Sequence, residues 1–340
     1  MGMEYLVTRL KAMRSEFIDQ SGIELFLSGK ELNSLVPLLN KSIFRKEIEK
    51  LNSKEKQNIS ISALERCISE GLLDIAHKVY DMIRKIDMKL AEVVFSRWEL
   101  EQIKYVIRYF LCGETIYEKR FRFLPLFPES RWVDNWRSFE SVSEFLQALK
   151  KLKHPFVNAI KASDSKTDTV IIETNLEKYY FQNYLSENKG HIGDAWEYFI
   201  DRCDILNIHQ AYLLRGKPEQ FNSFEKHFID GPGRMNIKQC LALLRCSPAD
   251  FKRNVEIKLH CKLNPECEGS AALFSLALRQ SFLKKYFQKS IETPTTRWDI
   301  FLFWEELFAV VSNLKLALRF NSSHTPLQEV ADYFVYRKIA

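Results

Sequence analysis

The chain has 340 residues, and its 50 Lys and Arg against 44 Asp and Glu give a formal net charge of +6. Glycine occurs only 11 times, and a share of about 3% against the usual ~7% disfavours folds built on glycine-rich phosphate-binding loops. The 25 Phe, 13 Tyr and 6 Trp can bury a large core, which excludes disorder as the main state. Because single domains cluster around ~100–150 residues, this length predicts more than one module.

We expect neither a membrane-spanning segment nor a secretion signal. The most apolar run, residues 301–304, meets Glu305 and Glu306 well short of the ~18 residues that a membrane helix needs. Residues 1–16 alternate apolar and charged side chains and lack the apolar core of a signal peptide. The seven cysteines are odd in number and spread along the chain, which is typical of reduced thiols in a cytosolic protein.

Helical periodicity dominates the chain from its first third onward. Apolar residues recur at helical spacing in residues 64–84, 103–111 and 276–287, and in the second of these Glu101, Lys104 and Arg108 fall on the polar side. The β-branched run at 169–172 is interpreted as a loop or the start of a helix. Gly216 and the proline two residues after it indicate the end of a helix. We therefore predict an all-α fold with about a dozen or more helices.

The helical pattern repeats along the chain. Three similar helices end near Arg108, Arg215 and Arg319, which lie 107 and 104 residues apart. Upstream helices begin near residues 64, 176 and 276, which lie 44, 39 and 43 residues before the respective arginines. A period of about one domain length indicates internal repetition. We predict three similar helical modules, at residues 1–114, 115–217 and 218–340.

Four stretches resemble a known family. They are residues 5–15; residues 144–149 with His154-Pro155-Phe156; residues 176–181 with Asp204, Asn207 and Arg215-Gly216-Lys217; and residues 327–335. The order and spacing of these stretches resemble those of the C subunit of A/V-type rotary ATPases, called subunit d in eukaryotic V-ATPases. The stretches span almost the whole length of the chain.

The resemblance implies a fold and a role. Three helical modules would form a funnel with pseudo-threefold symmetry, whose central cavity receives the tip of the central stalk. The opposite face would rest on the membrane proteolipid (c) ring. The protein would be a non-catalytic, cofactor-free subunit that couples the stalk to the ring during ATP-linked ion transport. It would be cytoplasmic and peripheral on the membrane, with no nucleic acid and no small-molecule substrate.

Four cations are the candidates for contacts with these partners. They are Arg108, Arg215, Lys217 and Arg319, placed at or just after the predicted helix ends. The alternative interpretation is helix capping, because a cation at a helix C-terminus interacts favourably with the helix dipole.

The sequence contains no well-matched catalytic or metal-binding motif. The sequence has no phosphate-binding Gly-x-x-x-x-Gly-Lys-Ser/Thr motif, and the glycine cluster at 231–234 favours a tight turn. Cys240, Cys246, Cys261 and Cys267 form two pairs with five residues between their members, a wider spacing than the two to four residues usual in zinc sites. The histidines are scattered, which is more typical of structural residues than of catalytic bases. A helical hydrolase therefore has no identifiable site.

Two basic runs, residues 119–122 and 150–153, remain open to two interpretations. Each is either a solvated helix face or a surface for an acidic partner. With the charge of +6, they are the only support for the alternative function, a helical-repeat scaffold that binds proteins or nucleic acid.

Overall fold

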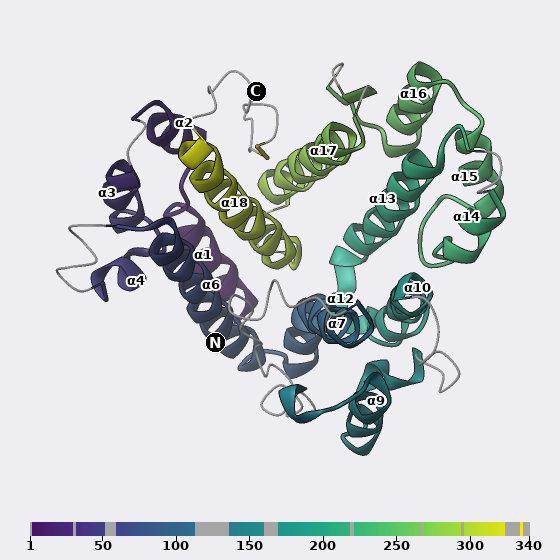
Figure 1. Cartoon of the computed structure of the whole chain (residues 1–340), viewed down its shortest axis with the longest axis horizontal. Coiled ribbons are helices and arrows are strands. Elements are labelled where there is room, and N and C mark those ends of the chain that lie inside the picture. The colour runs from purple at the N-terminus through teal and green to yellow at the C-terminus, as the bar shows by residue number, and fades with distance from the viewer. Residues whose placement is uncertain are drawn as a thin grey trace. The chain divides into compact units, whose positions relative to one another are not determined.

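A computed structural model describes residues 2–29, 32–51, 59–112, 136–159, 169–217, 221–264, 267–268, 270–293, 296–323 and 334–335. All regular elements within these residues are helical and none is a β-strand (Figure 1), which confirms the predicted all-α fold class. No helix in this part of the chain is long and apolar enough to cross a membrane.

The chain divides into two compact units. Unit 1 comprises Met1–Val79 and Ser247–Ala340, and unit 2 comprises Tyr80–Cys246. The first boundary falls inside a single long helix, α6 (Ile61–Arg84). The three modules at 1–114, 115–217 and 218–340, and the funnel they would form, stay predictions.

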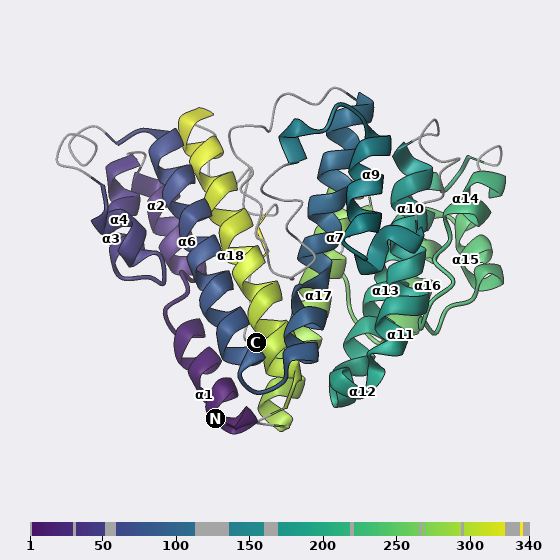
Figure 2. The ribbon, with the colours of Figure 1, turned by 90° about the horizontal axis from the view of Figure 1, so that it is seen from below.

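Unit 1 is built around the last long helix of the chain. Its elements are α1 (Met3–Arg14), α2 (Gln20–Gly29), η1 (Leu32–Ser34), α3 (Leu35–Asn40), α4 (Arg45–Glu49), most of α6, α16 (Pro248–Leu259), α17 (Ala271–Glu292) and α18 (Trp298–Ser323). Helices α1, α2 and α17 all pack against α18 (Figures 1 and 2). The first and last parts of the sequence therefore share one core.

Buried charges hold α1 to α18. The Arg14 guanidinium donates to Glu306, with Nη2 2.9 Å from Oε1, and its Nη1 lies 3.3 Å from Asp299 Oδ1. Lys11 approaches the other oxygen of Asp299 at 3.4 Å. Asp299 is fully buried, and a buried carboxylate is tolerated only with such partners. These contacts fix how α1 lies on α18.

Unit 2 contains most of the short helices. Its elements after α6 are α7 (Met88–Cys112), η3 (Trp136–Ser138), α9 (Val142–Lys151), η4 (Pro155–Ala159), α10 (Thr169–Tyr179), η6 (Tyr180–Tyr184), α11 (Leu185–Glu187), α12 (Lys189–Ile192), η7 (Gly193–Ala195), α13 (Trp196–Leu214), α14 (Phe221–His227) and α15 (Ile237–Leu244). Helix α7 packs against α9, α10 and α12, and α13 packs against α14 and α15.

Several local predictions are confirmed. The periodic segments 64–84, 103–111 and 276–287 lie within α6, α7 and α17. The run at 169–172 begins α10, so its interpretation as a helix start is correct. Gly216 follows α13 with φ +74°, a left-handed conformation that favours glycine and ends the helix. Of the segment at 327–335, residues 327–333 lie outside the described residues, and Phe334 and Val335 lie in no helix.

Candidate functional site

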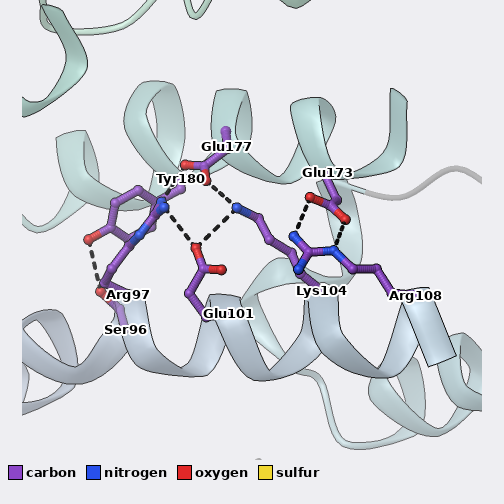
Figure 3. Close-up of polar contacts among 8 residues, drawn as sticks. All are labelled: Ser96, Arg97, Glu101, Lys104, Arg108, Glu173, Glu177 and Tyr180. Atoms are coloured by element: carbon purple, nitrogen blue, oxygen red, sulfur yellow. Dashed lines mark hydrogen bonds and ion pairs between the residues drawn. The ribbon is translucent and has the colours of Figure 1, made fainter. Parts of the chain in front are cut away.

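Six charged side chains connect α7 to α10 inside unit 2 (Figure 3). We call them the charged seam: Arg97, Glu101, Lys104 and Arg108 of α7, and Glu173 and Glu177 of α10. The four residues of α7 are spaced by four, three and four, and the two of α10 by four, so each set lies along one helix face. The polar side of α7 therefore faces a second helix.

Glu177 is the centre of the charged seam. Its carboxylate accepts from both Arg97 and Lys104. The same two cations also reach Glu101, at 2.7 Å from Arg97 Nη2 and 3.2 Å from Lys104 Nζ. Lys104 is only 4% exposed and Glu177 8%, whereas the side chains of Arg97 and Glu101 are 28% and 42% exposed, so a buried ion pair is flanked by a cation and a carboxylate nearer to water.

The pKa values in the charged seam follow from these contacts. Burial by itself would raise the pKa of Glu177, but the charges of Arg97 and Lys104 outweigh it and lower this pKa to about 2. Burial likewise opposes the charge of Arg97, and Glu177 and Glu101 outweigh it and raise the pKa of the guanidinium. Burial raises the pKa of Tyr180, whose hydroxyl lies 3.4 Å from Ser96, to about 12. All these groups keep their usual charges at neutral pH, so the charged seam is suited to holding two helices together.

A π-helical turn lies at one end of the charged seam. Residues Tyr180–Tyr184 form this turn, which continues α10 into α11. Tyr180 and Tyr184 stack with ring centroids 6.1 Å apart, and the Arg97 guanidinium lies 5.8 Å from the Tyr180 ring centroid. The turn thus places two buried aromatic rings beside the ion pairs.

A second buried polar cluster joins α7 to the turn after α9. His154 and Glu99 are almost completely buried, with His154 Nε2 2.9 Å from Glu99 Oε1. The backbone N–H of Phe156 donates to His154 Nδ1 at 3.3 Å, so we assign the ring proton to Nε2, which donates to Glu99. Gln102 Nε2 donates to the other carboxylate oxygen at 3.0 Å. The histidine therefore has a structural role, which agrees with the interpretation of the scattered histidines as structural residues.

Two asparagines hold the chain in the same way in the two units. The Asn207 side chain donates to the carbonyl of Ile229 and accepts its N–H, both at 2.9 Å. Asn313 makes the same pair of bonds with Val335, at 2.8 and 3.0 Å. In each case the partner lies 22 residues further along the chain, and the asparagines are 106 residues apart. This recurrence agrees with the internal repetition expected from the sequence.

The glycine cluster at 231–234 wraps around a carboxylate of α13. Asp204 accepts the backbone N–H groups of Arg234 and Met235, each at 3.0 Å. A Cβ on Gly233 would come within 2.5 Å of Asp204 Oδ1, so only glycine fits there. These backbone donors therefore bind a carboxylate of the protein itself.

The four predicted partner-binding residues are dispersed. Arg108 lies in the charged seam, where its Nη2 donates to Glu173 at 2.7 Å and its side chain is 38% exposed. Arg215 follows the last residue of α13 with its guanidinium 4.9 Å from the Tyr212 ring centroid, and Lys217 is exposed two residues later. Arg319 is exposed on α18 of unit 1. Their contacts with other proteins stay a prediction.

The three arginines that were predicted near helix ends do not occupy the same place there. Helices α7 and α18 continue for four residues beyond Arg108 and Arg319, so only Arg215 marks the end of a helix. Relative to the two asparagines, Arg215 lies eight residues after Asn207 but Arg319 six after Asn313. Capping accounts for Arg215 alone. Sequence reasoning also missed Glu173 and Glu177 as partners, and their spacing of four residues was the available signal.

The cysteines lie on helices and loops of both units. Among the described residues, no group of three or more His, Cys, Asp or Glu is placed to hold a metal ion. Cys240 is buried in α15 of unit 2, whereas Cys267 belongs to unit 1. Burial raises the pKa of the Cys203 and Cys240 thiols to about 12, so both are neutral apolar groups at physiological pH.

Comparison with known proteins identifies the family. The model of the ATP synthase (C/AC39) subunit family matches residues 6–296, which is most of the chain. A search of curated proteins found no match. The matched range includes the N-terminal helix and the charged seam, and the helical fold agrees with the resemblance read from the sequence. The chain therefore belongs to the ATP synthase (C/AC39) subunit family, a family of V/A-type rotary ATPase subunits.

Proposed function

We propose that the chain is a non-catalytic central-rotor subunit, which couples the central stalk of a V-type ATPase to the membrane proteolipid ring. The observation that carries the proposal is the family match over residues 6–296. In this role the chain binds neither cofactor nor small-molecule substrate, and it works on the cytoplasmic face of the membrane. The catalytic sites for ATP belong to other subunits.

The internal packing suits a part that transmits torque. A torque-bearing body must resist sliding of its helices, and close-packed helix interiors resist compression. In unit 2 the charged seam fixes α7 against α10, and in unit 1 the contacts of Arg14 fix α1 against α18. A slide of α1 by one turn, about 5.4 Å, would separate Arg14 from its carboxylates, and the same slide of α10 would leave part of the charged seam unpaired, so such slips are costly.

Arg108, Arg215, Lys217 and Arg319 are the residues that we propose contact the stalk. Lys217 and Arg319 are exposed, and exposed charge contacts contribute little to stability, so reversing both charges should affect folding little. Arg108 differs, because it also pairs with Glu173 and its reversal would weaken unit 2 itself. The exposed pair is therefore the cleaner test of partner binding.

The test is a pull-down of the central-stalk subunits with the full-length chain, run beside a thermal melt. We expect the wild-type chain to bind, and K217E/R319E to bind more weakly while melting at the same temperature. Removing the chain from the assembled enzyme should separate ATP hydrolysis from ion pumping. Normal binding by K217E/R319E would remove these two residues from the interface, and no binding by the wild-type chain would refute the function.

A further inference from the structure

Helices α9 of unit 2 and α16 of unit 1 begin and end alike. Each starts after a serine whose hydroxyl accepts a backbone N–H three residues later. Ser141 accepts the N–H of Glu144 at 3.3 Å, and Ser247 accepts that of Asp250 at 3.2 Å. Each is closed by a backbone bond of 3.0 Å to a carbonyl five residues back, His154 to Leu149 in α9 and Cys261 to Glu256 in α16. The two serines are 106 residues apart, the same separation as Asn207 and Asn313, so we interpret the helices as corresponding elements of the predicted repeat.

Both helices end in a conformation that favours glycine. Lys153 has φ 54° and His260 has φ 50°, and within the described part of the chain they are the only residues other than glycine with positive φ. They lie 107 residues apart, and each directly precedes the residue whose backbone N–H closes its helix. Glycine is the usual residue there because it has no Cβ to clash. Ionisable side chains thus occupy both positions against the preference of the backbone.

Each helix, together with the residues that follow it, also presents three exposed cations. They are Lys150, Lys151 and Lys153 at α9, and Arg253, Lys258 and Lys262 at α16. None of the six side chains forms a hydrogen bond or ion pair within the described residues, whereas some exposed cations elsewhere do, such as Arg84 with Asp81 and Lys89 with Glu92.

Carboxylates are scarce around both ends. Residues 145–159 contain no Asp or Glu. In residues 251–264 the only one is Glu256, which accepts the Leu263 N–H at 2.8 Å. From outside this stretch Glu268 pairs with Lys252 of α16 at 3.3 Å, so cations still outnumber carboxylates around both helix ends.

Helix capping accounts for only part of this pattern. A cation in the last turn interacts favourably with the helix dipole, which explains Lys150, Lys151 and Lys258. The dipole effect falls off within a turn, so it explains neither Arg253, further inside α16, nor Lys262, beyond its end. It also gives no reason for a lysine instead of glycine at position 153. The recurrence in two repeats therefore indicates a use on the surface.

We propose that these two helix ends are equivalent docking sites for acidic segments, rich in Asp and Glu, on other subunits of the rotary ATPase. The identity of the partners as ATPase subunits rests on the proposed function, whereas their acidic character rests on the cations. At α16, Ile257 is 59% exposed between Arg253 and Lys258 and adds an apolar contact inside the charged rim.

A protein partner fits better than a lipid surface. Electrostatic attachment to anionic membranes uses clusters of about four to eight Lys and Arg, whereas each end offers three that are exposed and, within the described residues, unpaired, since Lys252 pairs with Glu268. The end of α9 also exposes no large apolar side chain that would enter a bilayer, since Leu152 and Val157 are half-buried.

The test uses full-length variants and the rotary ATPase assembled without this chain. K150E/K151E/K153E reverses the α9 site, and R253E/K258E/K262E reverses the α16 site. The matched control, K41E/K46E/K78E, changes the net charge by the same amount at three exposed lysines of unit 1. We expect each site variant to bind the complex roughly tenfold more weakly than the control at about 50 mM salt, with a smaller difference at about 200 mM.

K153G adds a readout that a purely structural role would not give. Glycine relieves the left-handed conformation, so this variant should melt at a higher temperature and yet bind more weakly. A higher melting temperature with unchanged binding would remove Lys153 from the site.

Two further probes separate the possible failures. If the wild-type chain does not bind the complex, the proposed function fails. The docking sites are then tested with a synthetic Glu-rich helical peptide. Weaker binding of this peptide by both site variants than by the control supports the sites. Equal binding of all variants to the complex or to the peptide overturns the sites. The docking sites are also overturned, in favour of a lipid surface, if the site variants lose binding only to vesicles of phosphatidylcholine and phosphatidylserine.

Discussion

Replacing Glu177 with glutamine removes the carboxylate that Arg97 and Lys104 share in the charged seam. Both cations keep Glu101 as a partner, at 2.7 and 3.2 Å, but Lys104 stays buried with half of its neutralising charge gone. Breaking a buried ion pair by removing one partner typically costs about 3–5 kcal/mol. E177Q should therefore destabilise the protein clearly.

The pKa of Glu177 gives the magnitude independently. Its value falls from 4.5 to about 2 on folding. A difference of about 2.5 units at 1.36 kcal/mol per unit corresponds to about 3 kcal/mol of stability from the ionised group. Because the folded pKa is depressed, this stability is fully present above pH ~4.5 and is lost as the pH falls toward ~2. The gap between wild type and E177Q should therefore shrink over that window.

The assay is urea unfolding followed by circular dichroism at pH 7 and at several pH values down to pH ~3. The control is E49Q, since Glu49 pairs with Arg45 in an ion pair whose side chains are both exposed, and its loss should change the free energy of unfolding little. A loss below about 1 kcal/mol for E177Q at pH 7 would refute the reasoning. So would a loss of the same size at every pH, because cavity or shape effects do not titrate.

Three further changes test other parts of the structure. K153G should raise the free energy of unfolding by about 0.5–1 kcal/mol in a thermal melt, and a decrease would contradict the left-handed conformation. N207A leaves the N–H and carbonyl of Ile229 buried without their partner, so urea unfolding should show a loss of about 2–3 kcal/mol; a loss below about 0.5 kcal/mol would show that water replaces the amide. G233A should destabilise by more than about 1 kcal/mol through the clash with Asp204, whereas G190A, which has open space around it, should not; equal melting temperatures would contradict the close approach.

The sequence by itself determined the helical character of the chain and its family. Periodicity is a local property, so residues 64–84, 103–111 and 276–287 were enough to predict helices that lie within α6, α7 and α17. The helix end at Gly216 was also predictable, because a left-handed conformation there is a property of glycine itself. The order and spacing of the matched stretches carried the resemblance that the family match confirms.

The partners of the helices were decided only in the tertiary structure. Periodicity indicates which residues share a face of α7, but not that Lys104 is buried against Glu177 of α10, 73 residues away. Likewise, repeat spacing contains no information on α1, which packs on α18 because Arg14 finds Glu306 nearly 300 residues later. Such contacts depend on the path of the whole chain, since the charges are buried only when both helices are in place. For the same reason, sequence reasoning did not find the charged seam and named Arg108 without its partner on α10.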